Sequence, residues 1–321
     1  MKWGILGCAN IATKSVIPAI QLSESDHLIA IASRDLLKAT TIAEQFNCKP
    51  IEGYDNLLSL DEIDAVYIPL PTGIHYEWVI KALNRNKHVL VEKSAGSNLA
   101  EVTEMVALAK SKKLALIENF QFQFHSQLHF VLDLLKNQTI GEIRHLRTSF
   151  GFPTFNEANN IRYDASLGGG VLLDAGAYTL KLVKFLFGNE FEVQSSTLNF
   201  NKKLMVDWFG SVTLVNKQKN IVCQGSYGFE NFYQCNFEIW GSIGKIVSTR
   251  CFTAHPGFSP TVFVETAQGI QEHNLPPDNH FLNMFKHFNE VVKCNDFEKS
   301  WNDTLCQAKL IEDVRNMALI F

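Results

Sequence analysis

A run of apolar residues that ends in charged side chains is the feature that most constrains the fold of this 321-residue chain. Val89, Leu90 and Val91 are followed directly by Glu92 and Lys93. Continuous apolar β-formers are typical of a strand buried on both faces of a parallel sheet, and such sheets bind ligands beyond the carboxyl ends of their strands. The run therefore predicts an α/β fold with Lys93 in an active site. The alternative is that Glu92 and Lys93 form a solvated loop pair.

The first 120 residues alternate expected strands with expected helices, which predicts right-handed βαβ units around one parallel sheet. Expected strands cover residues 3–7, 27–33, 63–70, 87–94 and 115–119. Expected helices cover residues 38–46, 76–84 and 99–110, with a helical pattern also from Val16 to Ile20. A first domain is therefore expected to close near residue 120.

A turn of mostly small residues joins the first expected strand to the first helix. It contains Gly7, Ala9, Asn10, Ile11 and Ala12, in the order Gly-x-Ala-x-x-Ala. Small residues let the backbone approach a pyrophosphate, which binds at the free amides and the positive end of the helix. The turn therefore predicts a dinucleotide site, although the same order fits a plain strand-to-helix turn.

The end of the second expected strand bears on the choice of cofactor. Ser33 and Arg34 stand where NAD-dependent folds carry an acid for the ribose hydroxyls, and an arginine there suits a 2'-phosphate. We therefore expect NADP(H) rather than NAD(H). Asp35 leaves an alternative, because it could pair with Arg34 at the surface.

Two further strand ends are expected to contribute to the cofactor site. Leu70, Pro71 and Thr72 form a loop after the third strand, and His75 begins the next helix. His75 is interpreted as a helix-start or groove-wall residue, with acid–base catalysis as the alternative. Asn119 lies at the tip of the last strand of this region.

From residue 121 onward the chain consists of short segments rich in β-branched and aromatic residues, which predicts a mostly antiparallel sheet. Expected strands cover residues 145–151, 193–204, 206–214, 220–227, 236–240, 244–249 and 261–265, after a helix over 128–136. Helices over 281–292 and 304–319, the second entered through 300–303, are expected to return toward the first domain. The second domain is therefore expected to span residues 121–321.

Three glycines, Gly168 to Gly170, open a further helix that carries Asp174 and Tyr178 one turn apart on the same face. The pattern therefore places a carboxylate and a phenol together, as a functional site requires. The alternative is a helix packed closely on a neighbour through its glycines, with Asp174 and Tyr178 as hydrogen-bonded core residues.

Composition narrows the class of protein. Hydrophobic residues make up 46% of the chain and its formal net charge is -4, which indicates an ordinary soluble globular protein with a small-molecule ligand and no nucleic-acid partner. Seven scattered cysteines without a Cys-x-x-Cys pair indicate neither disulfides nor a metal site. No signal peptide or membrane-span pattern is visible, so we expect a cytoplasmic protein without a membrane partner.

The ordered set of motifs resembles the glucose-fructose oxidoreductase/inositol dehydrogenase (Gfo/Idh/MocA) family over nearly the whole chain. The motifs are residues 3–12, Ala32-Ser33-Arg34, Pro69 to Thr72 with His75, Lys87 to Lys93, Glu118-Asn119-Phe120, Gly141-Glu142-Ile143, Ile161-Arg162-Tyr163, Gly168 to Gly170 and Asp174-x-Gly176-x-Tyr178. Within the family the chain resembles most the NADPH-dependent 3-ketoreductases of nucleotide-linked deoxysugar biosynthesis. That resemblance rests on the residue 161–163 stretch, Tyr178, Gly241-Ser242-x-Gly244 and Arg250-x-Phe252-Thr253.

The resemblance implies a Rossmann domain followed by an α/β domain whose open sheet supports homodimers or homotetramers. It implies that Lys93 lies between the nicotinamide and the substrate, and that Glu92 and residues 70–75 contact the cofactor. Arg162 would reach the nicotinamide end, and Asp174 would help to hold the substrate. Tyr178 is then the expected proton donor, because a nearby ammonium such as that of Lys93 favours the phenolate.

One departure from the family concerns Ser94, which stands where the family has a proline after the lysine. Proline restricts the backbone on both sides of its peptide bond, so Ser94 relaxes the presentation of Lys93. Pocket specificity is expected to depend on loops such as 151–160 and 252–260.

The leading hypothesis for function is reduction of a nucleotide-linked 3-keto sugar by NADPH. One alternative is an NADP-dependent dehydrogenase of a free polyol, sugar or dihydrodiol. The other, motivated by Ser94, is an NADP-binding sensor or assembly protein that has lost turnover.

Overall fold

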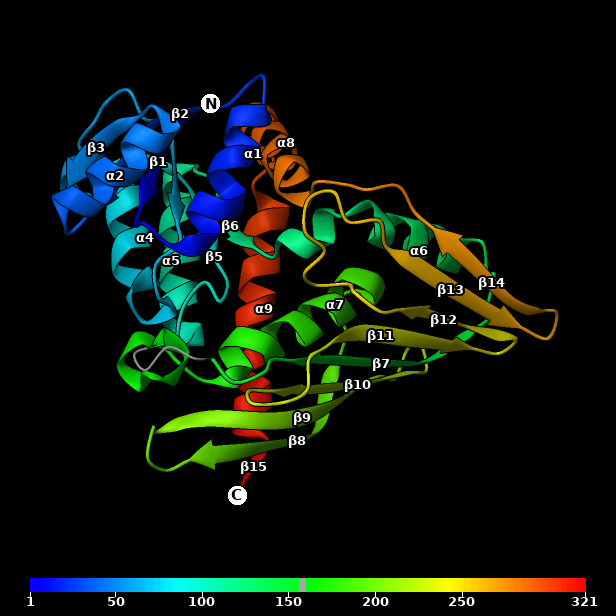
Figure 1. Cartoon of the computed structure of the whole chain (residues 1–321). Helices are drawn as coiled ribbons and strands as arrows, with labels where there is room; N and C mark the ends of the chain where they lie inside the picture. The colour runs from blue at the N-terminus through cyan, green and yellow to red at the C-terminus, as the bar shows by residue number, and fades with distance from the viewer. Residues whose placement is uncertain (156–159) are drawn as a thin grey trace. The chain divides into compact units, whose positions relative to one another are not determined.

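The computed structural model describes residues 1–155 and 160–321, which divide into two compact units. Unit 1 comprises Met1–Asn119 and Phe281–Ala308, and unit 2 comprises Phe120–His280 and Lys309–Phe321. Each unit is built on its own sheet (Figure 1).

Unit 1 contains a six-stranded sheet in the order β3-β2-β1-β4-β5-β6, in which every neighbouring pair is parallel. The strands are β1 (Lys2–Leu6), β2 (His27–Ser33), β3 (Lys49–Glu52), β4 (Ala65–Ile68), β5 (His88–Glu92) and β6 (Leu116–Asn119). Strands β4 and β6 are buried at every position, as expected for a parallel sheet covered on both faces. The strand order is that of the Rossmann fold, which confirms the predicted α/β class.

The helices of unit 1 follow its strands. They are η1 (Ala12–Val16), a π-helical turn, α1 (Ile17–Leu22), α2 (Leu36–Phe46), α3 (Tyr54–Leu58), η2 (Thr72–Ile74), α4 (His75–Asn84), α5 (Leu99–Lys112), α8 (His280–Cys294) and the first part of α9 (Glu298–Asn316). Trp3 of β1 packs against Phe285 and Phe288, with ring centroids 5.0 and 4.8 Å apart. These contacts explain why α8, late in the chain, belongs to the core of unit 1.

Unit 2 contains a nine-stranded sheet in the order β14-β13-β12-β11-β7-β10-β9-β8-β15 (Figure 1). The strands are β7 (Ile143–Gly151), β8 (Glu192–Asn201), β9 (Val206–Asn216), β10 (Ile221–Gly228), β11 (Gln234–Gly241), β12 (Gly244–Ser248), β13 (Thr261–Thr266), β14 (Gly269–Asn274) and β15 (Ala318–Ile320). Only the pairs β7–β10 and β8–β15 are parallel, which confirms the mostly antiparallel sheet.

The helical segments of unit 2 lie mainly before β7 and between β7 and β8. They are η3 (Gln121–Phe124), α6 (Ser126–Lys136), η4 (Ile161–Tyr163), η5 (Ala165–Leu167), the π-helical turn η6 (Leu172–Gly176) and α7 (Ala177–Phe187). Leu128 of α6 and Leu180 of α7 are buried in one core with Leu146 and Phe150 of β7. Helices therefore cover one face of the sheet.

The end of the chain differs from prediction. Helix α9 begins at Glu298 and ends at Asn316, so residues 300–303 lie within the helix instead of preceding it. The predicted continuation to residue 319 is wrong, because Ala318–Ile320 form β15, which pairs with β8 at Ser196 to Leu198. Strands β3 and β14 and the short helix α3 were also not predicted.

Within the described residues, no helix is long and apolar enough to cross a membrane.

Candidate active site

The turn after β1 has a backbone shape that favours glycine. Gly7 has a φ of +115°, and a Cβ atom there would lie 2.9 Å from Cδ2 of Leu70. The turn and the loop after β4, both predicted to bind the cofactor, therefore lie against each other. Ala12 is fully buried and packs in the core, whereas Asn10 is exposed.

At the end of β2, the side chain of Arg34 is exposed, whereas that of Asp35 is hydrogen-bonded to the start of the next helix. Asp35 Oδ1 accepts a hydrogen bond from the backbone N–H of Leu37 at 2.9 Å, and its own N–H donates to Ser33 Oγ at 3.1 Å. Asp35 is therefore the N-cap of α2. The Asp35 carboxylate therefore has a role within the helix start, and the binding of a 2'-phosphate by Arg34 stays a prediction.

Glu92 is fixed at the carboxyl edge of the sheet by residues from both neighbouring strands. Its Oε1 accepts hydrogen bonds from the hydroxyl of Tyr67 in β4 and from Nδ2 of Asn119 in β6, each at 2.6 Å. Burial raises the pKa of Glu92, and these hydrogen bonds oppose that rise. The strand therefore ends in an anchored carboxyl group, with half-buried Lys93 directly after it.

His75 contacts two loops next to this edge, the loop after β4 and the loop after β5. The side chain is fully buried, with Nε2 2.7 Å from the carbonyl oxygen of Leu70 and Nδ1 2.8 Å from that of Ser94. The peptide bond between Lys93 and Ser94 is cis. Because both ring nitrogens face backbone carbonyls, His75 supports the loops that carry Leu70 and Lys93, and its contact with the cofactor stays a prediction.

In unit 2, the two predicted residues Arg162 and Asp174 lie together. Arg162 Nε donates to Asp174 Oδ2 at 2.6 Å, and the guanidinium carbon lies 4.6 Å from the ring centre of Phe155. The glycines before the helix permit this arrangement: a Cβ on Gly169 would lie 2.6 Å from the carbonyl oxygen of Arg162. The Asp174 carboxylate is therefore oriented by a guanidinium.

Tyr178, on α7, lies in a cluster of aromatic rings. Its ring centre is 4.9 to 5.6 Å from those of Phe120, Phe122, Phe150 and Phe252. Its hydroxyl lies 3.3 Å from Nε2 and 3.4 Å from Oε1 of the buried Gln121. Tyr178 is thus buried, and its hydroxyl oxygen is oriented by the amide of Gln121.

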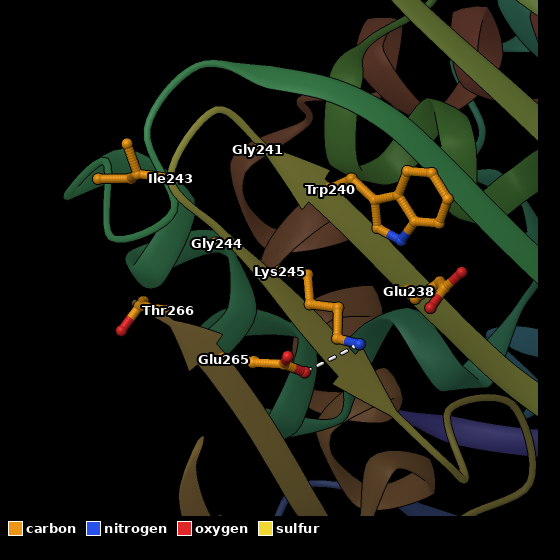
Figure 2. A pocket seen from close by; sticks show the side chains of 8 residues that line it. All are labelled: Glu238, Trp240, Gly241, Ile243, Gly244, Lys245, Glu265 and Thr266. Atoms are coloured by element: carbon orange, nitrogen blue, oxygen red, sulfur yellow. Dashed lines mark ion pairs between the residues drawn. The ribbon is translucent and has the colours of Figure 1, made fainter. Parts of the chain in front are cut away.

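A pocket of about 400 Å³ lies elsewhere on unit 2, at β11, β12 and β13 (Figure 2). It is lined by Glu238, Trp240, Gly241, Ile243, Gly244, Lys245, Glu265 and Thr266, and Lys245 pairs with Glu265 across it at 2.8 Å. None of these residues was predicted to bind cofactor or substrate.

Within the part of the chain that the structure describes, no group of three or more His, Cys, Asp and Glu side chains is arranged to hold a metal ion.

Models of known protein families match both parts of the chain. The model of an oxidoreductase family with an NAD-binding Rossmann fold, GFO/IDH/MocA, matches residues 1–120, and the C-terminal domain model of the same family matches residues 129–247. The chain belongs to the GFO/IDH/MocA oxidoreductase family. This confirms the resemblance found in the ordered motifs.

Individual relatives match the chain over its full length. A dTDP-3,4-didehydro-2,6-dideoxy-alpha-D-glucose 3-reductase from Actinomadura kijaniata is 35% identical over 99% of this chain and 96% of its own length. A reductase of the same name from Streptomyces violaceoruber is 36% identical over 99% and 95%. The crystal structure of KijD10, a 3-ketoreductase from Actinomadura kijaniata in complex with NADP and TDP-benzene, has a TM-score of 0.96 and 34% identity, and covers 100% of this chain and 98% of that one.

Sequence reasoning missed two residues of the candidate site, Tyr67 and Gln121. Tyr67 is a β-former within an apolar strand, and its side chain is indistinguishable by pattern from a core residue. Gln121 alternates with Phe120, Phe122 and Phe124, and a polar residue inside an aromatic run is the one signal that could have marked it.

The predicted catalytic residues are divided between the units: Lys93 belongs to unit 1, whereas Asp174 and Tyr178 belong to unit 2. Of the predicted specificity loops, 252–260 is described, and 151–160 includes residues 156–159, which lie outside the described residues.

Proposed function

We propose that this protein is an NADPH-dependent 3-ketoreductase of a nucleotide-linked deoxysugar. The observation that carries the proposal is the full-length similarity to reductases named for that reaction. The NADP complex of KijD10 supports the cofactor. The oxidoreductase family, shown by both units, supports the reaction class.

Two features of unit 1 fit NADP. The φ of Gly7 gives the first turn the close backbone approach that a pyrophosphate requires. Arg34 is exposed at the end of β2, where a 2'-phosphate would bind, and the Asp35 carboxylate caps α2.

Arg34→Ala should therefore weaken NADPH binding about tenfold or more and NADH binding much less. Equal losses for both cofactors would contradict the 2'-phosphate assignment.

The reduction adds a hydride to the carbonyl carbon of the sugar and a proton to its oxygen. When bound, NADPH supplies the hydride, and the protein supplies position, charge and the proton. We assign the proton to the phenol of Tyr178, whose oxygen is oriented by Gln121. Lys93, at the end of β5, is assigned to the same carbonyl oxygen or to the nicotinamide ribose, with its ammonium favouring the phenolate left on Tyr178.

Asp174 is assigned to the hydroxyl groups of the sugar. Its carboxylate is oriented by Arg162, and a carboxylate accepts hydrogen bonds from such hydroxyls. The contact of Arg162 with the nicotinamide end of the cofactor stays a prediction. So do the contacts of Leu70, Pro71, Thr72, Glu92 and Asn119.

The proposal is tested by following NADPH oxidation with a dTDP-linked 3-keto-deoxysugar as substrate, beside NADP+ reduction with free polyols, sugars and dihydrodiols. Turnover of the nucleotide-linked ketone alone is expected. Turnover confined to a free polyol would favour the dehydrogenase alternative. NADPH binding without any turnover, in both wild type and Ser94→Pro, would favour a sensor or assembly role.

We further propose that unit 2 forms a homodimer or homotetramer through the face of its sheet that the helices leave open, in a cytoplasmic protein. Exposed apolar side chains of this sheet support this: Ile243 in the turn between β11 and β12, Ile270 in β14, Phe209 in β9, and Leu319 and Phe321 at the end of the chain. The ion pair between Lys245 of β12 and Glu265 of β13 lies close to Ile243 (Figure 2). Analytical ultracentrifugation should find a dimer or tetramer that Ile243→Glu weakens, and a monomeric wild type would refute the proposal.

A further inference from the structure

Arg250, in the segment after β12, differs from every other arginine of unit 2. Each of the others pairs with a carboxylate at an N–O distance of 2.6 to 3.7 Å: Arg144 with Glu142, Arg147 with Glu238, Arg162 with Asp174, and Arg315 with Glu312. Among the described residues, 1–155 and 160–321, no carboxylate pairs with Arg250. Its positive charge is therefore left for a ligand or for solvent.

The guanidinium of Arg250 is nevertheless held in place. Its carbon lies 5.5 Å from the ring centre of Tyr233 and 5.6 Å from that of Phe258, and Nε points at the carbonyl oxygen of Thr253 at 3.5 Å. The backbone is also anchored, because Gln127 Nε2 donates to the Arg250 carbonyl oxygen at 3.3 Å. Aromatic rings orient the planar cation without neutralising it. A half-buried, oriented guanidinium is suited to a phosphate, which its fork of N–H groups matches.

The segment that carries this cation also reaches the proposed proton donor. Phe252, two residues after Arg250, is fully buried, and its ring centre lies 5.6 Å from that of Tyr178. Thr253, the next residue, is hydrogen-bonded through its hydroxyl to that of Tyr233. Residues 250–253 thus connect an unneutralised cation to the aromatic cluster around the reacting phenol, within one unit.

We propose that Arg250 binds the diphosphate of the nucleotide-linked substrate. The inference rests on the proposed function, and it assigns to one side chain the part of the substrate that distinguishes a sugar nucleotide from a free sugar. A diphosphate contact is the same in ground state and transition state, so it contributes to affinity and not to hydride transfer. Loss of Arg250 should therefore raise KM for the sugar nucleotide and leave kcat little changed.

The test is calorimetric titration of the NADP+-bound protein with dTDP, with thymidine and with inorganic diphosphate. Arg250→Met is expected to weaken binding of dTDP and of diphosphate about 10- to 100-fold, the range for a charge-assisted contact, and to leave thymidine unaffected. Arg250→Lys, which retains the charge without the fork, should lie in between. Arg144→Met is the matched control, since it removes an exposed arginine with its own partner, and it should bind dTDP as the wild type does.

The outcomes separate the inference from the function on which it rests. If the wild type binds dTDP and Arg250→Met binds it equally well, the inference is overturned and the proposed function stands. If Arg250→Met loses affinity for NADP+ instead of dTDP, Arg250 belongs to the cofactor and the inference is likewise overturned. If the wild type binds neither dTDP nor diphosphate, both fall. With substrate, a drop in kcat at unchanged KM would also contradict the inference.

Discussion

At the scale of single residues, Tyr178 and Lys93 carry the proposed chemistry. Tyr178→Phe keeps the ring in its aromatic cluster, and Lys93→Ala removes a half-buried ammonium at the end of β5. Each should lower kcat by about 100-fold or more, the scale of a positioned acid–base group. Single-turnover kinetics with NADPH and the ketosugar measure this. A Tyr178→Phe variant with the wild-type rate would remove Tyr178 from the proton-transfer role.

We expect Gln121 to position the same phenol. Its amide lies 3.3 to 3.4 Å from the hydroxyl of Tyr178 and is buried. Gln121→Leu, of similar size, should lower kcat roughly tenfold, the loss expected for one hydrogen bond, with KM for NADPH unchanged. The kinetic constants of the variant, beside its thermal midpoint, distinguish positioning from packing. A lower midpoint with an unaltered kcat would assign Gln121 to packing alone.

His75 predicts a loss of stability in acid. Burial lowers the pKa of His75 to about 4, against 6.5 for the ordinary side chain, although its two carbonyl neighbours oppose the shift. Between these values the unfolded chain binds the proton and the folded chain does not, so falling pH favours unfolding by up to roughly 3 kcal/mol.

The thermal midpoint of the wild type should therefore fall as the pH drops from 6.5 toward 4. His75→Gln should show a shallower fall, because the residue no longer titrates, whereas the exposed His255→Gln should behave as the wild type. Parallel curves for wild type and His75→Gln would show that His75 is not the group responsible.

At the scale of elements, Gly170 fixes the start of the helix that carries Asp174 and Tyr178. It has a φ of +116°, and a Cβ there would lie 2.4 Å from Oδ1 of Asp207. The same carboxylate accepts a hydrogen bond from the backbone N–H of Leu172, and so caps this helix. The glycine and the cap therefore act on one helix start.

Gly170→Ala should destabilise the protein by about 2 kcal/mol or more and lower activity, because both the backbone strain and the displaced carboxylate act at this site. Gly269 is a matched control, with a φ of +119° and no atom within 4 Å of the added Cβ. Gly269→Ala should show the backbone cost alone. Equal losses of stability in the two variants, measured by chemical denaturation, would mean that the contact with Asp207 contributes nothing.

The elements that could be predicted are those whose apolar residues repeat. The sequence pattern located β2 at its observed bounds and β5 to within a residue or two. Strand β14 could not be predicted, because nearly all its side chains are exposed, and β15 could not, because its pairing with β8 comes from tertiary structure. The same holds in the site: strand ends and glycines marked Lys93 and Asp174, whereas the hydrogen bond from Gln121 depends on packing.

At the scale of the whole molecule, the chain divides its chemistry between two units. Unit 1 carries the Rossmann sheet with Gly7, Arg34 and Lys93, and unit 2 carries Asp174, Tyr178 and Arg250. The cofactor residues and the substrate residues are therefore expected to be separable by mutation. Arg34→Ala should affect NADPH binding without dTDP binding, and Arg250→Met the reverse.

Reduction at C3 of a nucleotide-linked sugar can be followed by tracing the hydride. The protein is incubated with NADPH deuterated at the transferable position and with a dTDP-linked 3-keto-deoxysugar, and the product is examined by proton NMR and mass spectrometry. One deuterium at C3 of the sugar, on the carbon that bears the new hydroxyl, is the predicted result. Deuterium at another carbon, or NADPH that remains unoxidised while both ligands bind, would contradict reduction at C3.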